Sequence, residues 1–297
     1  MMNVGTAERF ESLRPLLVRH AYRMLGQYGD AEDVVQDAYL RWNDALSRGV
    51  IENDQAFLRT TVTHLCLDRL RSARAKREVY VGPWLPEPVV SPDSDPAEAA
   101  SLADDISFAL LLALERLAPL ERAAFLLHDV LDVPFAEVAQ TLGRAEPAVR
   151  KLASRAREHV RDANRRVADR AKAMQLRDAF LDALMNEDAA AMSELLAADV
   201  VFTSDGGGKV PAATVPVAGR GNVAALLVGL KHKGAAGLRR VELVTLNGMP
   251  GVLTFSDAGV DTAVALEIAD GRIAAMYAVR NPDKLRAIAA QLSKSRP

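Results

Sequence analysis

Residues 134–160 read PFAEVAQTLGRAEPAVRKLASRAREHV. Apolar residues recur at three- and four-residue steps in 134–142 and again from residue 146 onward, which predicts two amphipathic helices. Three residues separate the helices, and the first of them, Gly143, suits a tight turn. The stretch therefore predicts a helix-turn-helix.

The second helix of this pair is basic. Between Arg144 and Arg170 there are nine basic and four acidic residues, a net charge of +5. Arginine and lysine on such a helix suit guanine edges and phosphates in the major groove, and Glu146 in the first turn can accept from cytosine N4. DNA is the expected partner, and a solvated helical hairpin is the alternative.

The residues before this stretch predict three long helices, at 10–25, 31–46 and 56–78, and two shorter ones, at 104–117 and 121–131. The third is basic, with a net charge of +5 between Arg59 and Arg77. Such a face can follow phosphates or a melted single strand. The stretch GDAEDVVQDAYL (29–40), which covers the start of the second helix, carries a net charge of −4, which repels DNA and suits a basic protein partner.

An acidic linker separates the two helical parts. Residues 82–96 hold five prolines, which disfavour helix and central strand. Residues 81–112 hold six acidic and no basic residues, so the net charge of −2 for the whole chain hides two strongly basic helices. With one cysteine, no signal peptide and no long apolar run, we expect a cytoplasmic protein with no membrane contact.

The pattern changes after residue 170. Helices are predicted at 171–185, 189–196 and 222–230, and strands at 200–204, 241–246, 251–255, 262–268 and 272–279. Asn247-Gly248 and Asp270-Gly271 are hairpin signals, and Asn281-Pro282 starts a last helix. This part is predicted to be α+β.

These features together resemble the sigma-70 family, and within it the extracytoplasmic-function (ECF) group. The stretch GDAEDVVQDAYLRW resembles region 2 of this family, and the helix-turn-helix stretch resembles region 4. The motifs WLPEP (84–88), DGGGK (205–209) and NPDKL (281–285) resemble the sigma-J-like subgroup, which has a C-terminal SnoaL-like domain. The implied fold is two all-α sigma domains followed by an α+β NTF2-like cone. The implied boundaries are region 2 at 1–80, linker at 81–108, region 4 at 109–168 and SnoaL-like domain at 171–297.

The resemblance also implies sites and partners. The β′ clamp helices of RNA polymerase would contact Asp30, Asp33, Val34, Gln36, Asp37 and Leu40. The −10 element would face Asn53, Arg59, Arg69, Arg71 and Arg74. The −35 element would contact Arg144, Glu146, Pro147, Arg150, Lys151, Ser154, Arg155 and Arg157. Interdomain regulation would use Trp84, Leu85, Pro86, Asp205, Gly206, Gly207, Gly208, Lys209, Asn281, Pro282, Asp283 and Lys284.

We expect a sigma factor that directs promoter-specific initiation and is a monomer when free. No catalytic residue, metal or cofactor is predicted. The C-terminal domain would modulate activity through interdomain contacts or a small ligand. One alternative is an NTF2-like enzyme or ligand-binding module fused to a helix-turn-helix regulator. Another is a dimeric one-component regulator, which leaves the acidic helix without a purpose.

Overall fold

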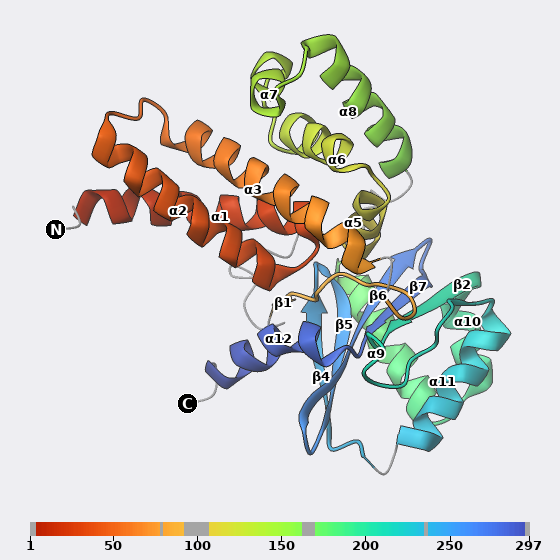
Figure 1. The fold of residues 1–297 in the computed structure, drawn as a ribbon. Coiled ribbons are helices and arrows are strands. Elements are labelled where there is room, and N and C mark those ends of the chain that lie inside the picture. The colour runs from red at the N-terminus through yellow and green to blue at the C-terminus, as the bar shows by residue number, and fades with distance from the viewer. Residues whose placement is uncertain (1–3, 78–79, 92–106, 162–169, 235–236, 295–297) are drawn as a thin grey trace. The chain divides into compact units, whose positions relative to one another are not determined.

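The structure is a computed structural model that describes residues 4–77, 80–91, 107–161, 170–234 and 237–294 (Figure 1). The chain divides into two compact units. The first comprises Met1–Val79 with Leu110–Asn164, and the second comprises Tyr80–Ala109 with Arg165–Pro297. In the described residues the first unit is helical and the second is α+β, which confirms the predicted fold class.

Three helices form the first part of the helical unit: α1 (Val4–Leu25), α2 (Tyr28–Arg48) and α3 (Asp54–Arg77). They pack on one another around fully buried side chains such as Trp42 and Leu58. The Trp42 indole nitrogen donates to Asp54 Oδ1 at 3.0 Å, so the largest core side chain is also fixed to the start of α3. The predicted helical periodicity therefore corresponds to real packed helices.

The second part of the helical unit begins at Leu110, inside α5 (Phe108–Glu115), and holds α6 (Pro119–Phe125), α7 (Phe135–Leu142) and α8 (Glu146–Val160). Gly143 ends α7 in the left-handed conformation, with φ of 60°, and α8 starts three residues later. The helix-turn-helix is thus present as predicted. The segment before this motif differs from prediction. The expected helix at 121–131 changes at residue 126 into one π-helical turn, Leu126–Val130.

The second unit contains one seven-stranded sheet in the order β1-β4-β5-β6-β7-β2-β3. The strands are β1 (Val90–Ser91), β2 (Leu196–Asp205), β3 (Val217–Ala218), β4 (Arg240–Leu246), β5 (Met249–Ser256), β6 (Gly259–Ala269) and β7 (Arg272–Val279). β2 and β7 are parallel, and every other pair is antiparallel. Asn247-Gly248 and Asp270-Gly271 form the predicted hairpin turns with positive φ.

The helices of this unit are α9 (Arg170–Met185), α10 (Ala189–Leu195), α11 (Arg220–Gly234) and α12 (Pro282–Lys294). Phe180 of α9, Met192 of α10 and Val223 of α11 belong to one apolar cluster with Phe202 of β2 and Met276 of β7. α12 packs on β6 outside this cluster. The core therefore lies between α9–α11 and the sheet.

β1 lies within 82–96, which the sequence predicts to be a linker because its prolines disfavour helix and central strand. Val90 and Ser91 pair with Leu246 and Thr245 at the edge of the sheet. Pro88 and Pro92 flank this short segment, and an edge strand tolerates nearby proline because one of its sides needs no hydrogen bonds. Residues 92–96 lie outside the described part of the chain.

Candidate functional site

The acidic residues predicted to bind polymerase lie on α2. Asp33, Gln36, Asp37 and Leu40 are exposed, and Asp30 is half-buried. Val34 is fully buried in the core, so it supports this face from beneath and does not lie on it. The exposed set combines carboxylates with Leu40, which is 56% exposed, and this combination suits a basic protein partner with an apolar contact.

The residues predicted to face the −10 element lie on α3 or just before it. Asn53 Oδ1 accepts from the Ala56 backbone at 3.0 Å and caps the start of α3. Arg71 is exposed and pairs with Asp68. Arg74 lies on α3, but its side chain is outside the described residues.

Arg69 connects the predicted DNA face with the predicted polymerase face. Its Nη1 lies 2.8 Å from Asp30 Oδ1 and 3.5 Å from Asp33 Oδ2. The sequence assigned these residues to different partners, and the structure shows them as one ion-pair group. No sequence spacing indicated this contact.

A set of polar contacts joins α3 to the helix-turn-helix within the same unit. Arg59 pairs with Glu137 at 3.2 Å, and its side chain is only 13% exposed. The Thr60 and Thr141 hydroxyls lie 3.2 Å apart, and His64 Nε2 lies 2.6 Å from the Thr141 carbonyl oxygen. Arg59 is therefore already occupied by a residue of α7.

A buried arginine reinforces this packing. Arg122 of α6 donates to the Met24 carbonyl oxygen at the end of α1 and pairs with Glu115 at 2.9 Å. Both side chains of that ion pair are largely buried. Because the unpaired carbonyls at a helix end need donors, Arg122 serves as a side-chain cap for α1.

The −35 candidates form one exposed face on α8 and the turn before it. Three of the arginines are paired: Arg150 with Glu146, Arg155 with Glu121 and Arg157 with Asp129. Arg144, Pro147, Lys151 and Ser154 are exposed on the same side of the motif. The side chains that face inward, such as Val149 and Ala153, are fully buried. The face is therefore polar and basic over a packed base.

In the second unit, Asp205 lies at the centre of a buried cluster. Its side chain is fully buried, and Oδ2 accepts from Lys284 Nζ at 2.6 Å and from the Leu85 backbone at 2.9 Å. Oδ1 accepts from the Tyr80 hydroxyl at 2.6 Å and from the Gly207 backbone at 2.9 Å. Four donors satisfy one carboxylate, which is how a buried charge is tolerated. We call Asp205, Lys284, Tyr80, Leu85 and Asn281 the linker clamp.

Lys284 closes the clamp from α12. Its ammonium also donates to the Leu85 carbonyl oxygen at 2.5 Å, so both backbone polar groups of Leu85 are held. The ammonium lies 4.2 Å from the centre of the Trp84 ring, within the range of a cation–π contact. Residues of the WLPEP, DGGGK and NPDKL motifs thus meet at one point.

Tyr80 is the clamp residue that sequence reasoning missed. Asn281 Nδ2 donates to its hydroxyl at 2.9 Å. Burial and the hydrogen bond to Asp205 raise the pKa of Tyr80, so the hydroxyl keeps its proton and acts as a donor to the carboxylate. A second missed contact is Asn247, which exchanges two hydrogen bonds with Val89.

Steric contacts explain why Gly206 and Gly207 of the DGGGK motif are glycines. A Cβ on Gly207, which has φ of 62°, would meet Asn281 Nδ2 at 2.2 Å. A Cβ on Gly206 would meet the Val210 carbonyl oxygen at 2.3 Å. Lys209 leaves this loop to pair with Asp283 in the first turn of α12, and that hydrogen bond holds the pKa of Asp283 below its usual value. The loop is thereby tied to α12 beside the clamp.

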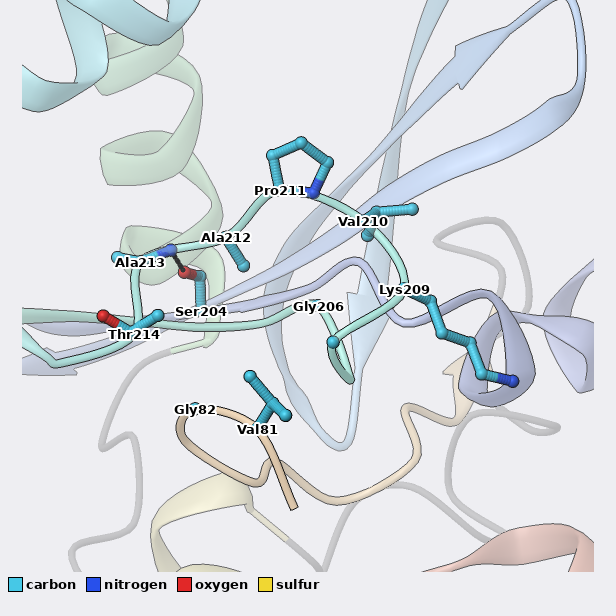
Figure 2. Close-up of a pocket in the computed structure, with 11 residues that line it drawn as sticks. Val81, Gly82, Ser204, Gly206, Lys209, Val210, Pro211, Ala212, Ala213 and Thr214 are labelled. Carbon is cyan, nitrogen blue, oxygen red and sulfur yellow. Dashed lines mark hydrogen bonds between the residues drawn. The ribbon is translucent and has the colours of Figure 1, made fainter. Parts of the chain in front are cut away.

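A pocket of about 340 Å³ lies next to the clamp. Figure 2 shows Val81 of the linker facing the loop, while the Lys209 side chain leaves toward α12. The pocket walls are mostly small apolar side chains. The Ser204 hydroxyl oxygen accepts a hydrogen bond from the Ala213 backbone. The lining residues are Val81, Gly82, Ser204, Gly206, Gly208, Lys209, Val210, Pro211, Ala212, Ala213 and Thr214.

Two negative findings concern the described residues. They contain no group of three or more histidine, cysteine or carboxylate side chains that could hold a metal ion. Among them, no helix is both long and apolar enough to cross a membrane.

Comparison with known proteins identifies both helical segments. The sigma-70 region 2 profile matches residues 9–76, and the sigma-70 region 4 profile matches residues 107–160. The ECF RNA polymerase sigma factor SigJ of Mycobacterium tuberculosis is 40% identical, over 93% of this chain and 91% of its own. The probable ECF sigma factor SigI of the same species is 32% identical, over 94% of each chain.

A solved structure extends this similarity to the whole fold. The crystal structure of M. tuberculosis SigJ matches with a TM-score of 0.78 and 37% identity, over 94% of this chain and 98% of that one. The similarity therefore includes the C-terminal α+β domain as well as both helical segments. The chain belongs to the extracytoplasmic-function sigma factors of the sigma-70 family, which act in transcription initiation and are not enzymes.

Proposed function

We propose that α2 docks on the β′ clamp helices of core RNA polymerase, that α3 contacts the −10 element and that α8 contacts the −35 element. The observation that carries this assignment is the separation of charge in the helical unit. The first half of α2, residues 28–40, carries four carboxylates and no basic residue, whereas basic residues outnumber acidic ones on α3 and α8. A carboxylate face repels phosphates, so α2 is suited to protein and α8 to DNA.

We further infer that the packed arrangement of the helical unit is a resting state. Arg59 is assigned to −10 DNA, yet Glu137 of the helix-turn-helix occupies it. Glu137 is half-exposed and the other polar contacts of α3 with α7 are hydrogen bonds, so polymerase and DNA can replace the contacts of α3 with α7 at small cost. Separation of α7 from α3 would then free both DNA-contacting elements. Before it binds polymerase, the protein is a monomer in this scheme.

The regulatory part of the proposal assigns the C-terminal domain to control of the linker. The linker clamp holds Tyr80 and Leu85, and Asn247 holds Val89 farther along. A linker fixed at these points has less freedom to span separated regions 2 and 4. The clamp therefore restrains the opening that promoter recognition requires.

The pocket is the observation that favours a ligand in this control. Val81 belongs to the linker, and Val210 and Ala212 belong to the loop that follows β2. A small, mainly apolar ligand between them would stabilise the seated linker by mass action, by an amount that grows with the logarithm of its concentration above Kd. Its expected effect is a lower transcription rate.

In vitro transcription with core polymerase on a pool of random promoter fragments tests the main assignment. The wild-type protein should yield promoter-dependent transcripts, and Asp33→Lys with Asp37→Lys should lose core binding. An Asp182→Lys/Glu194→Lys double variant, whose residues are exposed on α9 and α10 of the other unit, is the matched charge control. Unchanged core binding by the α2 double variant would refute the assignment of that face.

The regulatory assignment has its own readout in the same assay. Removal of residues from 171 onward should change the transcription rate while core binding persists. Equal rates with and without these residues would contradict linker control.

A further inference from the structure

Three side chains of the helix-turn-helix form a continuous stack. The His128 ring, on the π-helical turn, lies 3.6 Å centre to centre from the Phe135 ring at the start of α7, with 27° between the planes. The Arg150 guanidinium carbon of α8 lies 4.4 Å from the Phe135 ring centre. Phe135 therefore separates a histidine from a predicted DNA-contacting arginine.

The base of the stack is fixed. His128 Nδ1 lies 2.9 Å from the Val133 carbonyl oxygen, and because a carbonyl only accepts, Nδ1 carries the hydrogen and donates it. This bond sets the plane of the imidazole ring. Phe135 packs on that plane and is itself only half-buried, so it presents its other side to Arg150.

A second contact fixes the edge of the guanidinium. Glu146 Oε1 accepts from Arg150 Nε at 3.1 Å and from Nη2 at 2.6 Å. The neighbouring edge, made by Nη1 and Nη2, has no other hydrogen bond among the described residues. That is an edge that can donate to both O6 and N7 of guanine.

Arg150 differs in this respect from its neighbours on α8. Arg155 and Arg157 form ion pairs with Glu121 and Asp129, but within the described part of the chain neither lies over an aromatic ring. The ring sets the plane of the Arg150 guanidinium and Glu146 sets its rotation. An arginine oriented before binding loses less conformational freedom when it meets a base pair.

We propose that Phe135 is a positioning residue that orients Arg150 to specify a guanine in the −35 element. This rests on the proposed assignment of α8 to that element. Phe135 makes no contact with the base in this scheme. It acts through the guanidinium, so its loss should reduce base discrimination more than overall DNA affinity.

The test uses full-length protein bound to core polymerase and a selected promoter whose −35 base pairs are changed one at a time. Phe135→Met keeps the apolar volume and removes the ring. It should reduce discrimination by about tenfold at one G·C pair, while affinity for non-specific DNA and its salt dependence stay unchanged. Phe135→Tyr, which keeps the ring, should restore wild-type discrimination.

Arg150→Ala separates the role of Phe135 from the assignment of α8 to the −35 element. It should remove discrimination at the same base pair, and the Phe135→Met/Arg150→Ala double variant should lose nothing more at that pair. If Arg150→Ala discriminates as the wild type does at every position, the assignment of Arg150 to base contact fails. If Arg150→Ala loses discrimination and Phe135→Met keeps it, the positioning role of Phe135 is overturned while the assignment of α8 stands.

Discussion

Two ion pairs join distant parts of the chain, one in each unit. Lys284 and Asp205 are 79 residues apart in sequence, and Arg59 and Glu137 are 78 apart. The side chains of the first pair are 5% and 0% exposed, and those of the second are 13% and 53% exposed. Two ion pairs with nearly the same separation in sequence thus differ in how much solvent reaches them. The buried pair is costly to break and suits a permanent clamp, whereas the second suits a contact that opens.

The largest effect is expected at the clamp. Lys284→Met leaves the Asp205 carboxylate buried without its cation and should lower the free energy of unfolding of the second unit by about 3–5 kcal/mol. Trp42 and Trp84 are the two tryptophans of the chain. In a Trp42→Phe background, urea unfolding followed by Trp84 fluorescence therefore reports this unit. Lys209→Met, which breaks an exposed pair of the same loop and helix, is the control and should cost less than about 1 kcal/mol. Equal losses in both variants would contradict the comparison.

An intermediate effect concerns pH in the helical unit. Burial, with smaller contributions from Arg23 and Arg59, lowers the pKa of His20 to about 3. The unfolded chain therefore binds a proton that the folded chain excludes, and stability falls as the pH drops below about 6.5. Between pH 7.5 and 5 this group should cost about 2 kcal/mol. The measurement is urea unfolding followed by Trp42 in a Trp84→Phe background.

His20→Gln isolates this contribution, because it removes the titrating group and leaves the other ionisable residues in place. The variant should lose about 2 kcal/mol of the pH dependence. An unchanged pH slope would show that His20 is not the group responsible.

The smallest effect is expected at the contact between α3 and α7. Glu137→Gln should lower the stability of the helical unit by at most about 1 kcal/mol, since Glu137 is half-exposed. Glu158→Gln, at an exposed position on α8, is the matched control. A loss from Glu137→Gln as large as that from Lys284→Met would mean that both ion pairs are permanent.

The helices, the helix-turn-helix and most strands could be predicted because their signals are local. Apolar periodicity placed α7 and α8, and the Asp-Gly and Asn-Gly dipeptides placed two hairpins. The pairing of Arg59 with Glu137 could not be predicted, because the sequence around one residue carries no information about the other. β1 was not predicted, because prolines disfavour a central strand and the edge position that tolerates them exists only in the folded sheet.

The clamp shows the same limit at finer detail. Three motifs predicted an interdomain site by resemblance, and the structure brings residues of all three together. The role of that site stays a prediction. Tyr80 was missed because its hydroxyl acquires a partner only when β2 is in place. Asn247 was assigned to a hairpin turn, which is correct, but its side chain also holds Val89.

The position of Lys284 has a consequence for the order of synthesis. Leu85 and Lys284 are 199 residues apart, so a ribosome that has made the linker must translate almost the whole C-terminal domain before the clamp can close. At 5–20 residues per second this interval is about 10–40 s. Once the second helical segment has been made, both helical segments and the linker exist without Lys284, the residue that holds Leu85. A chain interrupted after residue 160 and before Lys284 would be released with both sigma segments but without its clamp.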